Sequence, residues 1–138
     1  MTLNKSVVLV RCENGVTLNG ENYADFARSR VWDGKKLRYG KISTTKLRGI
    51  YGLIMNIYSR INAPEDFEGC KSDIQYLKVK MAYEAGRDQD VKEFIKGTYL
   101  MALVAYIDSY EKFILYCRYA ESLVAYTKFF EPHSGGKE

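Results

Sequence analysis

Proline stands at only two positions of this 138-residue chain, Pro64 and Pro132, so residues 65–131 run without one. Proline in a helix interior removes a hydrogen bond and clashes with the preceding turn, so its absence leaves long helices open. Glycine is also sparse in this stretch, at Gly69, Gly86 and Gly97. The length suits one domain that buries a core without staples. We therefore expect a single, mainly helical domain.

Apolar residues recur at steps of three and four, the spacing of one helix face. This spacing predicts a short helix and four longer ones, over Glu21–Arg30, Thr44–Ile61, Ser72–Ala85, Asp90–Ile107 and Ser109–Phe130. The last segment is apolar nearly all round, which predicts a place in the centre of a bundle or in a subunit interface.

Helix ends are predicted from capping residues. Hydroxyl groups of Ser43, Thr44 or Thr45 can cap the start of the Thr44–Ile61 helix, and Pro64 ends that segment. Gly86 is the predicted end of the third helix, because glycine tolerates the left-handed conformation. The pairs Asp90–Glu93 and Asp108–Glu111 resemble capping boxes, and the second pair suggests a break near Ile107.

The predicted fold class is all-α: a compact bundle of four to five helices with a short N-terminal arm or hairpin. Valines on both sides of Asn14-Gly15, a turn signal, suggest the hairpin. Trp32–Gly40, with two glycines and many charges, is expected to be a loop. We expect an arm at residues 1–20, the helical bundle at 21–131 and a tail at 132–138.

Composition excludes several classes of protein. The three cysteines, Cys12, Cys70 and Cys117, are widely spaced, which argues against a disulfide framework and a zinc site and suggests reduced thiols. The longest apolar run, Tyr99–Ile107, covers about half of the ~20 residues that a membrane span needs. We expect a cytoplasmic protein with no membrane contact, no cofactor and no metal.

Candidate catalytic groups are few. The single histidine, His133, adjoins Ser134 in a tail flanked by proline and glycine, which offers no rigid third group or oxyanion site. Glu84 and Asp88 could be read as paired carboxylates, but Arg87 beside them favours a surface ion pair. We expect no enzymatic activity.

Charge is concentrated in one segment. The net charge is +4, yet residues 28–48 hold eight cations and one anion, so this segment carries +7 and the rest of the chain −3. A basic segment on a mildly acidic body suggests a polyanionic partner. Lys41, Lys46 and Arg48 flank a helix start whose free N–H groups could cradle phosphate. A solvated loop before a capped helix explains the same residues.

Two further groups of residues admit two interpretations. Tyrosines on the predicted helices could stack on nucleobases, but their spacing favours core or interface positions; they are Tyr76, Tyr83, Tyr116, Tyr119 and Tyr126. Arg118 and Lys128, on the apolar last helix, could present their charge to phosphate or pair on the helix surface.

Four short motifs resemble those of one family. They are Ser43-Thr44-Thr45-Lys46-Leu47-Arg48, then Tyr76-Leu77 with Ala82-Tyr83-Glu84-Ala85-Gly86-Arg87, then Cys117-Arg118-Tyr119 through Lys128-Phe129, and Gly135-Gly136-Lys137-Glu138. In this order the chain is similar to the small subunit of the type III-A CRISPR effector complex, the Csm complex. Glu131–Ser134 resembles an insertion before the final motif, and the arm before Gly20 is longer than the family pattern requires.

The resemblance implies a helical subunit without catalytic activity. In that family, several copies form the inner filament of the ribonucleoprotein and contact guide and target RNA along the backbone, whatever the RNA sequence. The other Csm subunits and further copies of the chain are the implied protein partners. The implied RNA-binding residues are Lys41, Lys46, Arg48, Arg60, Arg87, Arg118 and Lys128. A homo-oligomeric helical scaffold without nucleic-acid binding is the alternative.

Overall fold

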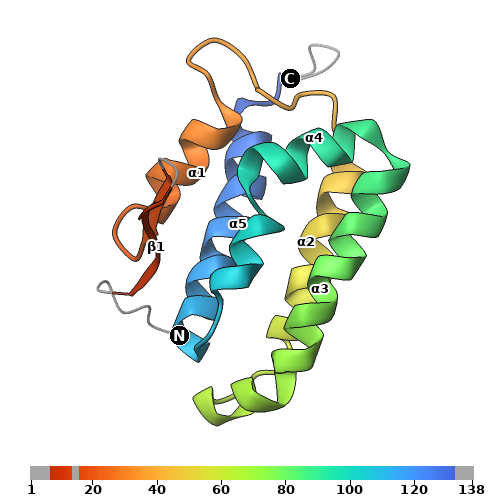
Figure 1. Cartoon of the computed structure of the whole chain (residues 1–138). Coiled ribbons are helices and arrows are strands. Elements are labelled where there is room, and N and C mark those ends of the chain that lie inside the picture. The colour runs from red at the N-terminus through yellow and green to blue at the C-terminus, as the bar shows by residue number, and fades with distance from the viewer. Residues whose placement is uncertain (1–6, 14–15, 133–138) are drawn as a thin grey trace.

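The computed structural model describes residues 7–13 and 16–132 and confirms an all-α bundle with a small N-terminal hairpin (Figure 1). The hairpin comprises β1 (Val8–Glu13) and β2 (Val16–Asn19), which pair antiparallel. Its predicted turn, Asn14-Gly15, lies outside the described residues, as does His133 with the rest of the tail after Pro132. Val7, Leu9, Val10 and Leu18 are buried, so the hairpin is part of the core.

Five α-helices and two short 3-10 helices follow the hairpin in the described chain. Their bounds are α1 Tyr23–Val31, α2 Thr44–Tyr58, η1 Pro64–Asp66, α3 Phe67–Arg87, α4 Gln89–Thr98, η2 Ala102–Tyr106 and α5 Tyr110–Phe130. In Figure 1, α5 runs through the middle of the bundle, between α1 with the hairpin on one side and α2 with α3 on the other. Helix α4 crosses one end.

The central position predicted for the last helix is confirmed. Nine residues of α5 are buried, among them Phe113, Leu115 and Leu123. The predicted apolar face of α2 is also confirmed, since Leu47, Ile50, Ile54, Ile57 and Ile61 are each at most 5% exposed. Ile61 itself lies beyond the end of α2. Trp32–Gly40 is irregular, as predicted.

Two predicted helix ends were wrong around Asp88. Gly86 does not end α3, which begins five residues earlier than predicted and continues to Arg87. The break comes at Asp88, whose backbone is extended and whose carboxylate accepts hydrogen bonds from the N–H groups of Asp90 and Val91. Asp88 therefore caps α4, and the predicted Asp90–Glu93 box does not.

The next break was also misplaced. The predicted helix to Ile107 stops at Thr98, because Tyr99 adopts a left-handed conformation with φ of 65°. A 3-10 helix, η2, then leads to the break that was predicted near Ile107. Ser109, rather than Asp108, caps α5 by accepting from the N–H of Lys112.

Hydrogen bonds from buried tyrosines of α5 stabilise the left-handed turn at Tyr99. The hydroxyl of Tyr119 donates to the carbonyl of Thr98 and that of Tyr116 to the carbonyl of Leu100, both at 2.6 Å. Burial raises the pKa of both phenols, which keeps them protonated as donors. The core positions predicted for these two tyrosines are confirmed.

The sequence allowed Tyr76 and Tyr83 of α3 to be core residues, and that alternative was wrong. Tyr76 and Tyr83 are 56% and 65% exposed, because they point away from the face of α3 that packs on the bundle. Tyr126 is half-buried and stacks on Phe130. Of the predicted thiols, Cys70 and Cys117 are free and buried, while the side chain of Cys12 lies outside the described part.

We predict that Tyr119→Phe lowers the free energy of unfolding by about 1–3 kcal/mol, because the buried carbonyl of Thr98 loses its donor. Urea unfolding followed by circular dichroism measures this loss. Tyr76→Phe, the same change at an exposed ring, should stay within about 0.5 kcal/mol of the parent. Equal effects of the two substitutions would contradict the prediction.

Candidate nucleic-acid interface

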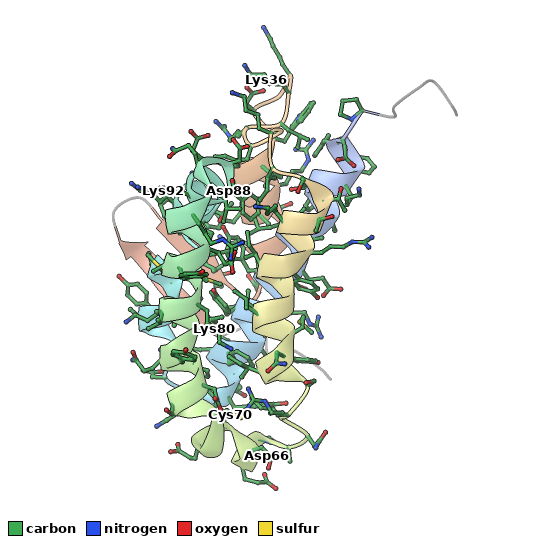
Figure 2. All side chains as sticks on the ribbon, turned by 90° about the vertical axis from the view of Figure 1, so that its right-hand side faces the viewer. Lys36, Asp66, Cys70, Lys80, Asp88 and Lys92 are labelled. Atoms are coloured by element: carbon green, nitrogen blue, oxygen red, sulfur yellow. The ribbon has the colours of Figure 1, made fainter. Side chains whose placement is uncertain are left out.

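Four parts of the chain meet at one end of the bundle. They are the loop at residues 32–43, the start of α2, the junction of α3 with α4, and the end of α5. Lys46 Nζ lies 2.7 Å from Asp88 Oδ2 and so joins α2 to the α3–α4 junction. Lys128 Nζ donates to Thr44 Oγ1 at 3.1 Å and joins α5 to α2. Figure 2 shows Lys36 at the tip of this end, above Asp88 and Lys92.

We call this surface the basic end. Its cations are Lys35, Lys36, Arg38, Lys41, Lys46, Arg48, Arg87, Lys92, Lys96 and Lys128. Its carboxylates are Asp33, Glu84, Asp88, Asp90, Glu93 and Glu131. Ten cations against six carboxylates leave a formal charge of +4, so the basic end attracts polyanions.

Aromatic contacts fix the loop to the helices at both of its ends. Trp32 stacks on Phe130 of α5 with a centroid distance of 4.1 Å. Tyr39 packs edge-on against Phe94 of α4 at 5.8 Å. Its ring lies directly against Gly97, where a Cβ atom would collide with it. The loop is therefore held in one position although its outer side chains are exposed.

Hydrogen bonds inside the loop turn its cations outward. Asp33 accepts from the backbone N–H groups of Lys36 and Lys35, and these bonds lower the pKa of its carboxyl below the usual value. Arg38 Nε donates to the carbonyl of Ser29 in α1 at 3.0 Å. The side chains of Lys35, Lys36 and Arg38 are exposed.

The start of α2 is capped from within the chain. Ser43 Oγ accepts from the N–H of Lys46 at 3.1 Å, as predicted for this hydroxyl. The ammonium of Lys46 is held by Asp88, and the hydroxyl of Thr44 accepts from Lys128. These contacts favour the capped helix over the phosphate cradle, because the ammonium of Lys46 and the hydroxyls of Ser43 and Thr44 already have partners within the chain.

Between the loop and α4 the surface is hollowed on both sides of Tyr39. One hollow, of about 290 Å³, is lined by Lys36, Arg38 and Lys41 together with two carboxylates. The other, of about 350 Å³, is lined by Gln89, Lys92, Glu93 and Lys96. Both contain charges of either sign and open to solvent. Such a surface can bind phosphate groups along a chain but offers no enclosed pocket for a small molecule.

The structure brings five of the seven candidate residues to the basic end: Lys41, Lys46, Arg48, Arg87 and Lys128. Arg60 lies beyond the other end of α2, about 20 Å along the helix from Lys46, where its Nη1 pairs with Asp73 at 3.1 Å. Arg118 lies halfway along α5 and is half-buried.

Sequence reasoning missed the cations of α4. Lys92 and Lys96 are both exposed and stand four residues apart on one helix face, beside the basic loop. Their i,i+4 spacing in the sequence could have indicated that both lie on one helix face. The contact between α4 and the loop could not be predicted, because it depends on the packing of Tyr39 against Gly97.

The predicted surface ion pair with Arg87 is found for Glu84, whose Oε2 lies 3.8 Å from Arg87 Nη1. Asp88 pairs with Lys46 instead, which was not predicted. Among the described residues, no group of three or more histidine, cysteine or acidic side chains is placed to hold a metal ion. Within the same residues, no helix is long and apolar enough to cross a membrane.

Fold and site define a small all-α bundle protein with one cation-rich end. The sequence model described as Csm2 Type III-A matches residues 20–133. A protein of Enterococcus italicus, named CRISPR system Cms protein Csm2, is 34% identical over 122 residues, which cover 77% of this chain and 87% of that protein. Proteins with the same name are 32% identical in Streptococcus thermophilus (88% and 98% covered) and in Mycobacterium tuberculosis (71% and 82%).

The chain belongs to the Csm2 family, the small subunit of the type III-A CRISPR complex. The resemblance seen in the four sequence motifs is thereby confirmed.

We predict that Gly97→Ala lowers the free energy of unfolding by about 1–3 kcal/mol, because the new methyl group displaces Tyr39 from α4. Gly49→Ala is the matched control. Nothing lies within 4 Å of a Cβ at Gly49 in α2, so alanine should stabilise that helix by about 0.5–1 kcal/mol. Urea unfolding measures whether each substitution lowers or raises the free energy of unfolding. A Gly97→Ala variant that is more stable than the parent would refute the close contact between Gly97 and Tyr39.

The ion pair at the basic end predicts a pH dependence. Bonds from Lys46 and then from the N–H of Val91 lower the pKa of Asp88 in the folded chain. The ionised carboxylate therefore stabilises the fold above the pKa of the unfolded chain, about 3.9, and this contribution disappears as pH falls through the folded pKa.

We expect the melting temperature of Asp88→Asn to lie below that of the parent at neutral pH, and the difference to vanish in acid. Thermal unfolding across pH measures the difference. In a Lys46→Ala background, the same substitution should change the melting temperature less. A constant difference at all pH values would show that the ion pair is not its source.

Proposed function

We propose that this chain is a non-catalytic subunit that contacts the backbone of guide and target RNA through its basic end. In this proposal it acts in the cytoplasm, in antiviral defence, as part of the inner filament of the complex. The observation that carries the proposal is the convergence of cations from four separate segments on one anchored surface.

The geometry favours phosphate over base recognition. The basic end is built from ammonium and guanidinium groups spread over an open surface. Contacts of this kind position a nucleic acid without reading its sequence. Because Trp32 and Tyr39 fix the loop before RNA arrives, little conformational entropy is lost when its cations bind. Such a surface suits a subunit that must accept any guide.

Family membership supports the proposed protein partners, namely the other Csm subunits and further copies of this chain. A single copy supplies few phosphate contacts, so the isolated chain should bind RNA weakly. Copies that stand side by side in a filament would multiply these contacts along one RNA.

We expect the isolated full chain to bind short single-stranded RNAs of unrelated sequence with equal affinity. The logarithm of the binding constant should fall with the logarithm of salt concentration, by about 0.7 for each phosphate neutralised. Arg48→Ala, Arg87→Ala and Lys128→Ala should each weaken binding and reduce this slope. Fluorescence anisotropy at several salt concentrations measures both quantities.

Lys112→Ala is the control for Lys128→Ala, since it removes the same charge near the opposite end of α5. It should leave RNA affinity unchanged. Arg60→Ala and Arg118→Ala test whether the two candidates outside the basic end also contribute. Tight binding to one sequence that is independent of salt would overturn the proposal. Absence of any RNA binding by the chain and by its assembled complex would favour the scaffold alternative.

A further inference from the structure

Two tyrosine–cation pairs stand on the exposed face of α3. The ammonium of Lys80 lies over the ring of Tyr76, 5.2 Å from the ring centre, and the guanidinium of Arg87 lies over the ring of Tyr83 at 5.3 Å. In each pair the cation follows the tyrosine by four residues, and the second pair follows the first by seven. Rings and cations therefore alternate along the helix. We call these four residues the aromatic–basic strip.

The aromatic–basic strip is open to solvent. Both rings are more than half exposed although a cation lies over each, and Lys80 and Arg87 are exposed as well. At 100° per residue the four side chains fall within about 60° of the helix circumference, away from the face that packs on the bundle. Figure 2 views this side of the bundle and shows Lys80 partway along α3, below Asp88.

The charge of the strip favours an anionic ligand. Among the described residues, no carboxylate pairs with Lys80. Glu84, at the edge of the strip, lies 3.8 Å from Arg87 Nη1, yet the side chain of Arg87 remains 54% exposed. An apolar protein partner would bury both cations without a counter-charge, which is unfavourable. Phosphate groups would supply that charge. Because Arg87 also belongs to the basic end, the strip continues that surface along α3.

The spacing of the rings favours a single strand with separated bases. Exposed aromatic rings stack on nucleobases of any sequence, and cations beside them follow the phosphate backbone. Tyr76 and Tyr83 are seven residues apart, about 10.5 Å along the helix. Bases stacked in a duplex strand are only about 3.4 Å apart, and they cover each other's faces. Unpaired nucleotides can leave this stack and offer a free face to each ring.

We propose that the aromatic–basic strip binds an unpaired stretch of RNA, with bases stacked on Tyr76 and Tyr83 and phosphates held by Lys80 and Arg87. The inference rests on the proposed function, because it takes RNA as the ligand, and it deepens that function. The basic end contacts the phosphates of any RNA, whereas the strip prefers strands whose bases are free. It reads no sequence, because every base has a face that can stack.

Removing the rings separates base stacking from charge attraction. Tyr76→Leu and Tyr83→Leu should each weaken the binding of single-stranded RNA by about fivefold or more. Tyr83→Phe keeps the ring and should bind like the parent. An abasic strand of the same length keeps the phosphates but has no bases, so neither leucine variant should change its affinity. The same holds for the RNA annealed to its complement. Fluorescence anisotropy on the full chain measures these affinities.

Lys71→Ala is the matched control for Lys80→Ala. Lys71 lies over the ring of Phe67 at 5.9 Å in the same helix, but Phe67 is only 3% exposed and offers no face to a base. Lys80→Ala should weaken binding of the intact and of the abasic strand, because it removes a phosphate contact. Lys71→Ala should leave both affinities unchanged. Circular dichroism of each variant shows whether the bundle remains folded.

Arg48→Ala, at the basic end, separates this proposal from the proposed function. If Arg48→Ala weakens RNA binding while both leucine variants bind single-stranded RNA like the parent, the strip proposal is wrong and the proposed function stands. The reverse result would support the strip and contradict the role of the basic end. Leucine variants that lose equal affinity for the abasic strand would also overturn base stacking. Leucine variants that keep RNA affinity but no longer capture another Csm subunit would assign the strip to a protein partner instead.

Discussion

One carboxylate, that of Asp88, determines how the basic end is assembled. It caps α4 through two backbone N–H groups and holds the ammonium of Lys46 at the start of α2. Because its own backbone is extended, α3 and α4 separate here instead of forming one rod. Helix α4 can then cross the end of the bundle (Figure 1) and offer Phe94 and Gly97 to the loop.

The rest of the basic end follows from that turn. Tyr39 can fix the loop only where α4 presents a glycine, and the left-handed Tyr99 that ends α4 is fastened in turn by the hydroxyl of Tyr119. Buried hydrogen bonds in the core and exposed cations at the surface thus belong to one connected arrangement. Its rigidity supports the proposed sequence-independent contact with phosphate, because flexible cations would lose more conformational entropy when they bind.

Much of this architecture could be predicted from the sequence. Long periodic segments identified the helices, and the nearly uniform apolar character of residues 113–130 predicted the buried centre. Helix ends were harder, because Asp88 and Tyr99 interrupt apolar patterns that continue across them. The concentration of cations at 28–48 pointed to the loop and the start of α2. Their convergence with Arg87 and Lys128 depends on tertiary contacts that no local pattern encodes.

Photo-crosslinking of RNA in the assembled type III-A complex, followed by peptide mapping on this subunit, tests the central claim most directly. The account predicts crosslinks in residues 32–48, in α4 and at the end of α5, for guides of unrelated sequence. Crosslinks confined to η1 and the first turns of α3, at the opposite end of the bundle, would contradict it.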